Sequence, residues 1–190
     1  NRKAASSDDV SDCLSYADIS ELVIGHVGRF NPQKNHPFLL KIFSALLKKE
    51  PSAILLLVGG GDDMPKIQAK ARELGITGHV RFLGVRSDVA DLMQAMDVFV
   101  FPSLYEGLPV TMVEAQASGL PCIISDKVPE ECIITEGLVD VMPLSASADD
   151  WADKILEKRA IPRTDHSEEV AAHGFDIEAE ALKLQEFYLN

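Results

Sequence analysis

The sequence predicts an α/β fold in which a parallel sheet is covered by helices on both faces. Short apolar runs alternate with segments whose apolar residues recur three and four positions apart, the pattern of strands and helices in βαβ units. Several runs are apolar at every position, as in strands buried on both sides. A chain of 190 residues, 46% of them hydrophobic, is long enough to bury a substantial core.

The predicted elements follow one another without an internal repeat. Strands are expected at residues 22–27, 53–58, 80–83, 98–101, 122–125 and 139–142. Helices are expected at residues 35–49, 64–74, 89–96, 109–118, 148–159 and 176–188. Polar, acidic stretches divide the chain into a linker at 1–20, a main domain at 21–165 and a closing helix within 166–190. Because the chain begins with Asn1, we expect it to be a fragment of a longer protein.

Capping residues support several helix boundaries. Pro37 suits the first turn of the helix at 35–49, and Pro109 is expected at the first position of the helix at 109–118. Gly75 is expected to end the helix at 64–74. Ser87 is expected to cap the helix at 89–96, with Asp88 in its first turn.

The composition argues against several classes of function. A net charge of −12 disfavours nucleic-acid and anionic-membrane partners, and no apolar run approaches the ~18 residues of a membrane helix. The start of the chain is unlike a signal peptide. The three cysteines suggest no disulfide framework, which favours the cytoplasm, and we expect Cys122 in the core. Without metal-ligand spacing among the histidines or any Asp-x-Asp, we expect no protein-built metal site.

Candidate site residues lie in loops that follow predicted strands, where ligands of such folds bind. In the first loop Gly28 permits close backbone approach, and Arg29 and Lys34 are cations that could hold a diphosphate. The alternative is a solvated basic loop before an amphipathic helix.

In the second loop Gly59 serves either a tight turn or the approach of a ligand, and the loop matches neither a dinucleotide fingerprint nor a phosphate loop. In the third, the backbone of Val85 and Arg86 could pair with a base edge.

The most informative stretch runs from Glu106 to Glu114. Glu106 lies in a Gly/Pro loop beside a helix N-terminus, where the amides of Gly107 and Leu108 can attract phosphate. Glu114 lies along the helix flank and could accept hydrogen bonds from vicinal hydroxyls. Phosphate beside hydroxyls describes a nucleotide-sugar. The alternatives are a dipole-compensating acid and an exposed helix glutamate.

One face of the same helix is expected to be polar and the other buried. The expected polar stripe is Thr111, Glu114 and Ser118, and the expected buried stripe is Val110, Val113 and Ala117.

Together these loops resemble the C-terminal, donor-binding domain of a GT-B-fold glycosyltransferase, in the retaining class called glycosyltransferase family four or group 1. The matching residues fall within 28–35, 58–61, 82–89, 95–103 and 106–121. The resemblance covers about residues 22 to 160 and implies a Rossmann-like lobe of a two-lobed enzyme. Residues 1–20 would be an interlobe linker remnant, and the helix in 166–190 would cross to the N-terminal acceptor lobe, which this chain lacks.

The resemblance also implies a role for each residue. Four charged residues, Arg29, Lys34, Glu106 and Glu114, would converge on one crevice. The two cations would neutralise the diphosphate, Glu106 would face the transferred sugar, and Glu114 would bind the ribose. Contacts to the sugar, the phosphates and the base would come from Gly107, Leu108, Thr111 and the neighbourhood of Val85 and Arg86.

The implied activity is transfer of a sugar, with retention and without a metal, to a saccharide or lipid-linked acceptor. Enzymes that make bacterial capsular or extracellular polysaccharide carry similar domains. The nucleotide-sugar, a UDP-sugar by expectation, is a substrate, so no cofactor is implied, and the departing phosphate is expected to accept the acceptor's proton. The chain alone is expected to bind nucleotide without turnover. The alternatives are a nucleotide-sugar epimerase lobe and a non-enzymatic nucleotide-binding module.

Overall fold

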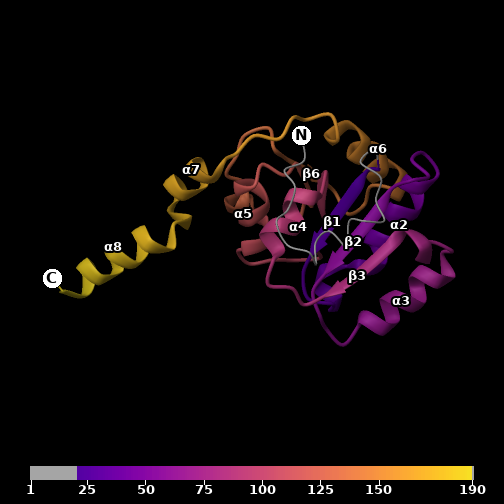
Figure 1. Cartoon of the computed structure of the whole chain (residues 1–190), viewed down its shortest axis with the longest axis horizontal. Helices are drawn as coiled ribbons and strands as arrows, with labels where there is room; N and C mark the ends of the chain where they lie inside the picture. The colour runs from indigo at the N-terminus through magenta and orange to yellow at the C-terminus, as the bar shows by residue number, and fades with distance from the viewer. Residues whose placement is uncertain (1–20, 190) are drawn as a thin grey trace.

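The computed structural model describes residues 21–189, and the linker expected at 1–20 lies outside them, as does Cys13. Its sheet has six strands in the order β3-β2-β1-β4-β5-β6, and every neighbouring pair is parallel (Figure 1). The strands are β1 (Val23–Val27), β2 (Ile54–Val58), β3 (Val80–Gly84), β4 (Val98–Phe101), β5 (Cys122–Ser125) and β6 (Val139–Met142). The predicted parallel sheet is confirmed.

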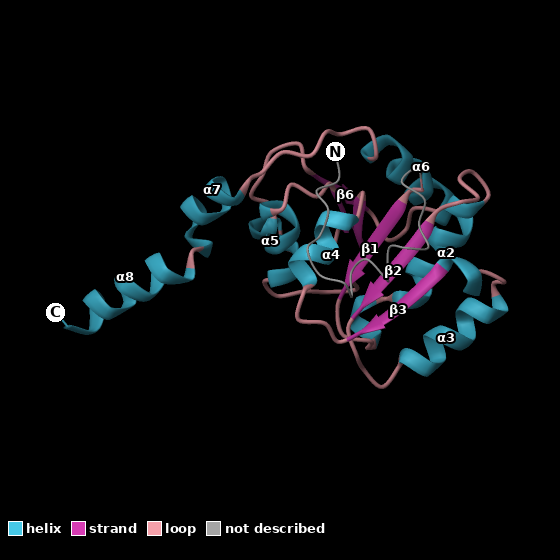
Figure 2. Cartoon of the chain, in the orientation of Figure 1, coloured by secondary structure: helices cyan, strands magenta, loops and turns pink. Residues whose placement is uncertain are grey.

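Helices connect the strands and continue beyond them (Figure 2). The α-helices are α2 (His36–Leu47), α3 (Met64–Glu73), α4 (Val89–Ala95), α5 (Val110–Ala117), α6 (Ala148–Lys158), α7 (Ser167–Val170) and α8 (Ile177–Leu189). The shorter turns are η1 (Pro32–Lys34), η2 (Thr77–His79), η3 (Glu130–Cys132) and the π-helical η4 (Ala171–Phe175). The short α7 and η4 were not predicted, because elements of 4 and 5 residues are too short to show an apolar period.

Helices cover both faces of the sheet, as predicted. One apolar cluster joins α2 and α6 to the sheet and includes Phe43, Leu55 and Trp151. A second cluster joins α4 and α5 to the opposite face and includes Met93 and Met112. All residues of β1 and β2 are buried, which explains why these strands are apolar at nearly every position.

The buried face of α5 agrees with the prediction at Val113 but not at Ala117, which is half-buried. Pro109 is the N-cap of α5, and the helix begins at Val110, which is 62% exposed. The buried residues include Gln116, which apolar spacing could not indicate. Its amide donates to the carbonyls of Met112 and Cys132 and accepts from the backbone beyond η3, so it is buried with its hydrogen bonds satisfied.

The C-terminal helices extend away from the sheet (Figure 1). α7 packs against α5, whereas α8 projects outward and leaves large apolar side chains exposed. These side chains include Ile177, Leu184 and Phe187. The division of the chain into a linker, a binding domain and a crossing helix stays a prediction.

Candidate active site

The strand order places a topological switch point between β1 and β4. The chain runs from β1 outward through β2 to β3, and from β4 outward through β5 to β6. In open α/β sheets, ligands bind beyond the carboxyl ends of the strands at such a point. The loops that follow β1 and β4 meet there, and they carry Lys34 and Glu106.

These two loops are joined by hydrogen bonds. The backbone amide of Leu104 donates to the carbonyl of Gln33 at 2.8 Å, and the Asn35 side chain donates to the carbonyl of Pro102 at 3.1 Å. Asn35 has a φ of 52°, and among residues 21–189 no other residue except glycine has a positive φ. Asparagine tolerates this left-handed conformation. The loop after β1 is therefore built to face the loop after β4.

A nearly buried ion pair lies between the loops. Lys34 Nζ is 2.7 Å from Glu106 Oε1, and the two side chains are 14% and 5% exposed. Glu106 Oε2 accepts a hydrogen bond of 3.0 Å from Gln33 Nε2, so both carboxylate oxygens have partners. Lys34 Nζ also lies 4.5 Å from the centre of the Phe101 ring, a cation–π contact.

The structure pairs two of the four charged residues predicted to converge. Arg29 is exposed on the same loop as Lys34, and Glu114 is exposed on α5, which follows the loop of Glu106. Within the described residues neither is ion-paired with Lys34 or Glu106, so their part in one crevice stays a prediction. Although Glu114 is at the surface, partial desolvation raises the pKa of its carboxyl group.

Glycines allow the loops after β1 and β2 to pack backbone against backbone. The amides of Gly28 and Phe30 donate to the carbonyls of Val58 and Gly60. A Cβ atom on Gly59, whose φ is +135°, would lie 2.1 Å from the Gly28 carbonyl oxygen. Packing within the protein thus requires glycine at position 59, and a contact from Gly59 to a ligand stays a prediction.

Gly28 is itself closely packed. A Cβ atom there would lie 3.2 Å from both His26 Nε2 and Lys34 Cε. Gly28 therefore fits between the His26 ring and the aliphatic part of the Lys34 side chain.

The loop before α5 is open at Gly107. A Cβ atom on Gly107 would meet nothing within 4 Å, and its φ is outside the left-handed range. The packing of the described residues does not require glycine there. Its predicted neighbours are accessible as well, since Leu108 is 53% exposed and Thr111 is half-buried.

The loop after β3 differs from the prediction at two residues. Ser87 does not cap α4, whose N-cap position is held by Asp88 without a capping hydrogen bond from its side chain. The Asp88 carboxylate instead accepts two hydrogen bonds from the Arg86 guanidinium, at 2.8 and 2.7 Å, which lower the pKa of Asp88. Val85 is 84% exposed beside them. The guanidinium of Arg86 is thus held by a neighbour, and a backbone contact from this loop to a base stays a prediction.

Two buried histidines beneath the site were not singled out from the sequence. The rings of His26 and His36 are 4.7 Å apart, and His26 Nδ1 is 2.9 Å from the Val100 carbonyl oxygen. Burial lowers the pKa of His26 and brings the pKa of His36 to about 4, with the charge of Lys34 adding to both effects. Both rings are therefore neutral at pH 7. The position of His26 inside an apolar strand was a signal available in the sequence, but its contact with His36 follows only from the fold.

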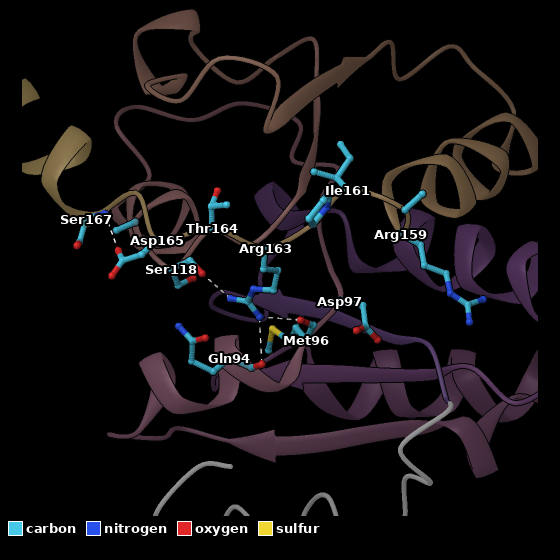
Figure 3. Close-up of a pocket in the computed structure, with 13 residues that line it drawn as sticks. Gln94, Met96, Asp97, Ser118, Arg159, Ile161, Arg163, Thr164, Asp165 and Ser167 are labelled. Atoms are coloured by element: carbon cyan, nitrogen blue, oxygen red, sulfur yellow. Dashed lines mark hydrogen bonds between the residues drawn. The ribbon is translucent and has the colours of Figure 1, made fainter. Parts of the chain in front are cut away.

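A hollow lies near the amino-terminal ends of β4 and β5 (Figure 3). Its volume is about 1050 Å³, and its lining includes Asp97, which precedes β4. The Arg163 guanidinium crosses it and donates to the carbonyls that end α4 and α5, including those of Met96 and Ser118. This arginine fastens the connector after α6 to two helix ends. The hollow therefore lies at the opposite ends of the strands from the loops that carry Lys34 and Glu106.

The described residues provide few other sites. Between residues 21 and 189, no three His, Cys, Asp or Glu side chains are grouped so that they could hold a metal ion. Over the same range, every helix is too short or too polar to cross a lipid bilayer. Cys122 is buried in the core as predicted, and Cys132 is also buried; both are free thiols.

The six-stranded parallel sheet with helices on both faces is Rossmann-like, and it matches one lobe of solved GT-B glycosyltransferases. Residues 21–158 match the family described as Glycosyl transferases group 1, and the chain belongs to that family.

Individual relatives agree with this assignment. EpsF of Bacillus subtilis (strain 168), described as a glycosyltransferase, is 42% identical over 170 residues, which are 88% of this chain and 44% of EpsF. The Escherichia coli UDP-Gal:alpha-D-GlcNAc-diphosphoundecaprenol alpha-1,3-galactosyltransferase is 30% identical over 64% of this chain and 34% of its own. Anabaena Alr3699/HepE, solved with UDP and glucose, shares the fold with a TM-score of 0.78 at 22% identity, over 96% of this chain and 51% of that one. The chain thus spans less than half the length of the two curated relatives.

Proposed function

We propose that this chain is the donor-binding lobe of a retaining glycosyltransferase and that it binds a UDP-sugar at the switch point. The observation that carries the proposal is the Lys34–Glu106 pair, held between the loops that follow β1 and β4. Support for UDP comes from the names of similar proteins, since HepE was solved with UDP and the E. coli relative uses UDP-Gal.

The diphosphate would lie between the loop after β1 and the start of α5. Arg29 and Lys34 supply positive charge on one side, and the amides that open α5 supply hydrogen-bond donors on the other. Cleavage of the anomeric bond builds negative charge on the departing phosphate. Groups fixed in place before the reaction stabilise that charge more than they stabilise the bound donor, and this difference accelerates transfer.

The sugar and the nucleoside would occupy the two sides of this phosphate site. In our proposal Glu106 accepts hydrogen bonds from hydroxyls of the transferred sugar, and Glu114 accepts those of the ribose. The open space over Gly107 leaves room for the donor, with Leu108 and Thr111 beside it. In our proposal the loop at Val85 and Arg86, where Val85 is exposed, would frame the base.

The reaction needs a second lobe that would carry the acceptor. We propose that α8 crosses to this lobe, because its apolar side chains are exposed here. The acceptor would be a saccharide or a lipid-linked sugar, as in the name of the E. coli relative. Transfer would proceed without a metal, and the leaving phosphate would take the acceptor's proton. The free thiols of Cys122 and Cys132 support a cytoplasmic location.

Calorimetric titration with UDP, GDP and ADP tests the proposal. We expect UDP to bind this chain with a Kd below about 1 mM, and to bind more tightly than the other two nucleotides. Absence of binding for all three at that concentration would contradict a nucleotide-sugar site.

A further inference from the structure

Gln33 fastens the two loops of the site by both its backbone and its side chain. It is the middle residue of η1, a turn in which the Asn31 side chain accepts a hydrogen bond from the Lys34 amide. The Gln33 carbonyl accepts from Leu104, while its Nε2 donates to the Tyr105 carbonyl and to Glu106 Oε2, each at 3.0 Å. The two hydrogens of the amide nitrogen are thus both engaged.

The carboxylate of Glu106 is divided between two partners of different charge. Oε1 is 2.7 Å from the Lys34 ammonium, and Oε2 is 3.0 Å from the neutral Gln33 amide. A carboxylate whose side chain is 5% exposed needs such partners, because an unpaired buried charge is strongly unfavourable.

A donor would change one of these contacts and leave the other. Phosphate oxygens compete with Oε1 for the Lys34 ammonium, since both are anionic acceptors. They compete less for the Gln33 amide, which also donates to the Tyr105 carbonyl and is held by the backbone bond to Leu104. When Lys34 moves toward phosphate, Oε1 is released to accept a hydroxyl, and Gln33 still holds Oε2.

We infer that Gln33 is a positioning residue, which holds the Glu106 carboxylate toward the transferred sugar while Lys34 is exchanged to the phosphates. This inference rests on the proposed function. It gives Gln33, on the loop after β1, a part in sugar recognition through Glu106 on the loop after β4. Gln33 itself would not touch the sugar.

The test compares UDP with UDP-glucose, UDP-galactose and UDP-N-acetylglucosamine by calorimetry on the whole chain. The sugar preference is the Kd of UDP divided by the Kd of the best-bound UDP-sugar. Gln33→Met keeps the side-chain size but loses the amide, and should lower this preference about tenfold while the Kd of UDP stays within about twofold. Gln33→Glu keeps the shape but places two carboxylates together, and should lower it at least as far. Gln68→Met, on α3, is the matched control and should change neither value.

A double-mutant cycle separates positioning from general damage. In a Glu106→Ala background, Gln33→Met should have no further effect on the sugar preference. An equal loss of UDP and UDP-sugar affinity, an unaltered preference in Gln33→Glu, or a full further loss in the Glu106→Ala background would each overturn the role of Gln33 alone. If the wild-type chain binds neither UDP nor any of the UDP-sugars, the proposed function fails and the inference falls with it.

Discussion

Lys34 Nζ lies 2.7 Å from Glu106 Oε1, although 72 positions separate the two residues in the chain. The contact exists because β1 and β4 are neighbouring strands, so that the loops at their carboxyl ends meet. Both side chains are nearly buried, and Gln33 occupies the second oxygen of the carboxylate. A cation and an anion are therefore held together at the carboxyl ends of the two central strands.

Loss of Lys34 should destabilise the chain. Lys34→Ala leaves the Glu106 carboxylate buried without its cation, so we expect the free energy of unfolding to fall by about 3 kcal/mol, as measured by urea titration. Lys66→Ala is the matched control, because Lys66 is 80% exposed in its ion pair with Asp63, and it should cost much less. Similar losses in the two variants would contradict a buried, stabilising pair.

The two glutamates of the motif should differ in their effect on nucleotide binding. If Glu114 binds the ribose, Glu114→Ala should weaken UDP about tenfold in calorimetry, because hydrogen bonds to a charged acceptor are lost. Glu106→Ala should weaken UDP much less, since the proposed partner of Glu106 is the sugar. Equal and negligible losses would refute these assigned roles.

The raised pKa of Glu114 predicts how UDP binding depends on pH. Ribose hydroxyls donate to the ionised carboxylate, so affinity should fall as acid protonates Glu114. Since desolvation favours the neutral form, the fall should begin at a higher pH than for an ordinary glutamate. Glu114→Gln should remove this dependence, and an identical pH profile in the variant would count against the contact.

The buried histidines predict a loss of stability in acid. Folding lowers the pKa of His36 from its ordinary value of 6.5 to about 4. The native state is therefore most stable above pH 6.5 and loses stability as the pH falls toward about 4. His36 alone should therefore cost about 2 kcal/mol between pH 7 and pH 5, as followed by urea unfolding. His36→Phe, which can still stack on Phe30, should flatten this decline. A parallel decline in both proteins would show that His36 is not its source.

Two glycines should separate stability from binding. Gly59→Ala forces a Cβ atom against the Gly28 carbonyl at positive φ and should cost about 2 to 4 kcal/mol. Gly107→Ala meets no protein atom and should leave the stability within about 0.5 kcal/mol, while weakening UDP-sugar binding if the donor lies against it. Unchanged binding in Gly107→Ala would remove Gly107 from the proposed site.

Much of the sheet could be predicted because its signals are local. An apolar run such as 54–58 specifies a buried strand by itself, and Gly75 ends α3 through its own positive φ. Val113 was predicted on the buried face of α5, but Gln116 could not be, because its hydrogen-bond partners include residues in and beyond η3. The role expected for Ser87 failed because Asp88 takes the N-cap position.

The residue types of the site could be predicted from the loops, and the convergence of Lys34 and Glu106 only through the resemblance to a family. Lys34 and Glu106 could be singled out as a cation and an acid in loops after strands. Their direct contact, and the hydrogen bonds from Gln33 to the loop after β4, depend on the order of the strands in the sheet.

The most direct test of the account is an amide chemical-shift titration of the chain with UDP, followed by NMR. We expect the largest shifts in Gly28–Asn35 and in Gly107–Glu114, on the two sides of the Lys34–Glu106 pair. Shifts confined to the hollow around Arg163, or none at millimolar UDP, would contradict a donor site at the switch point.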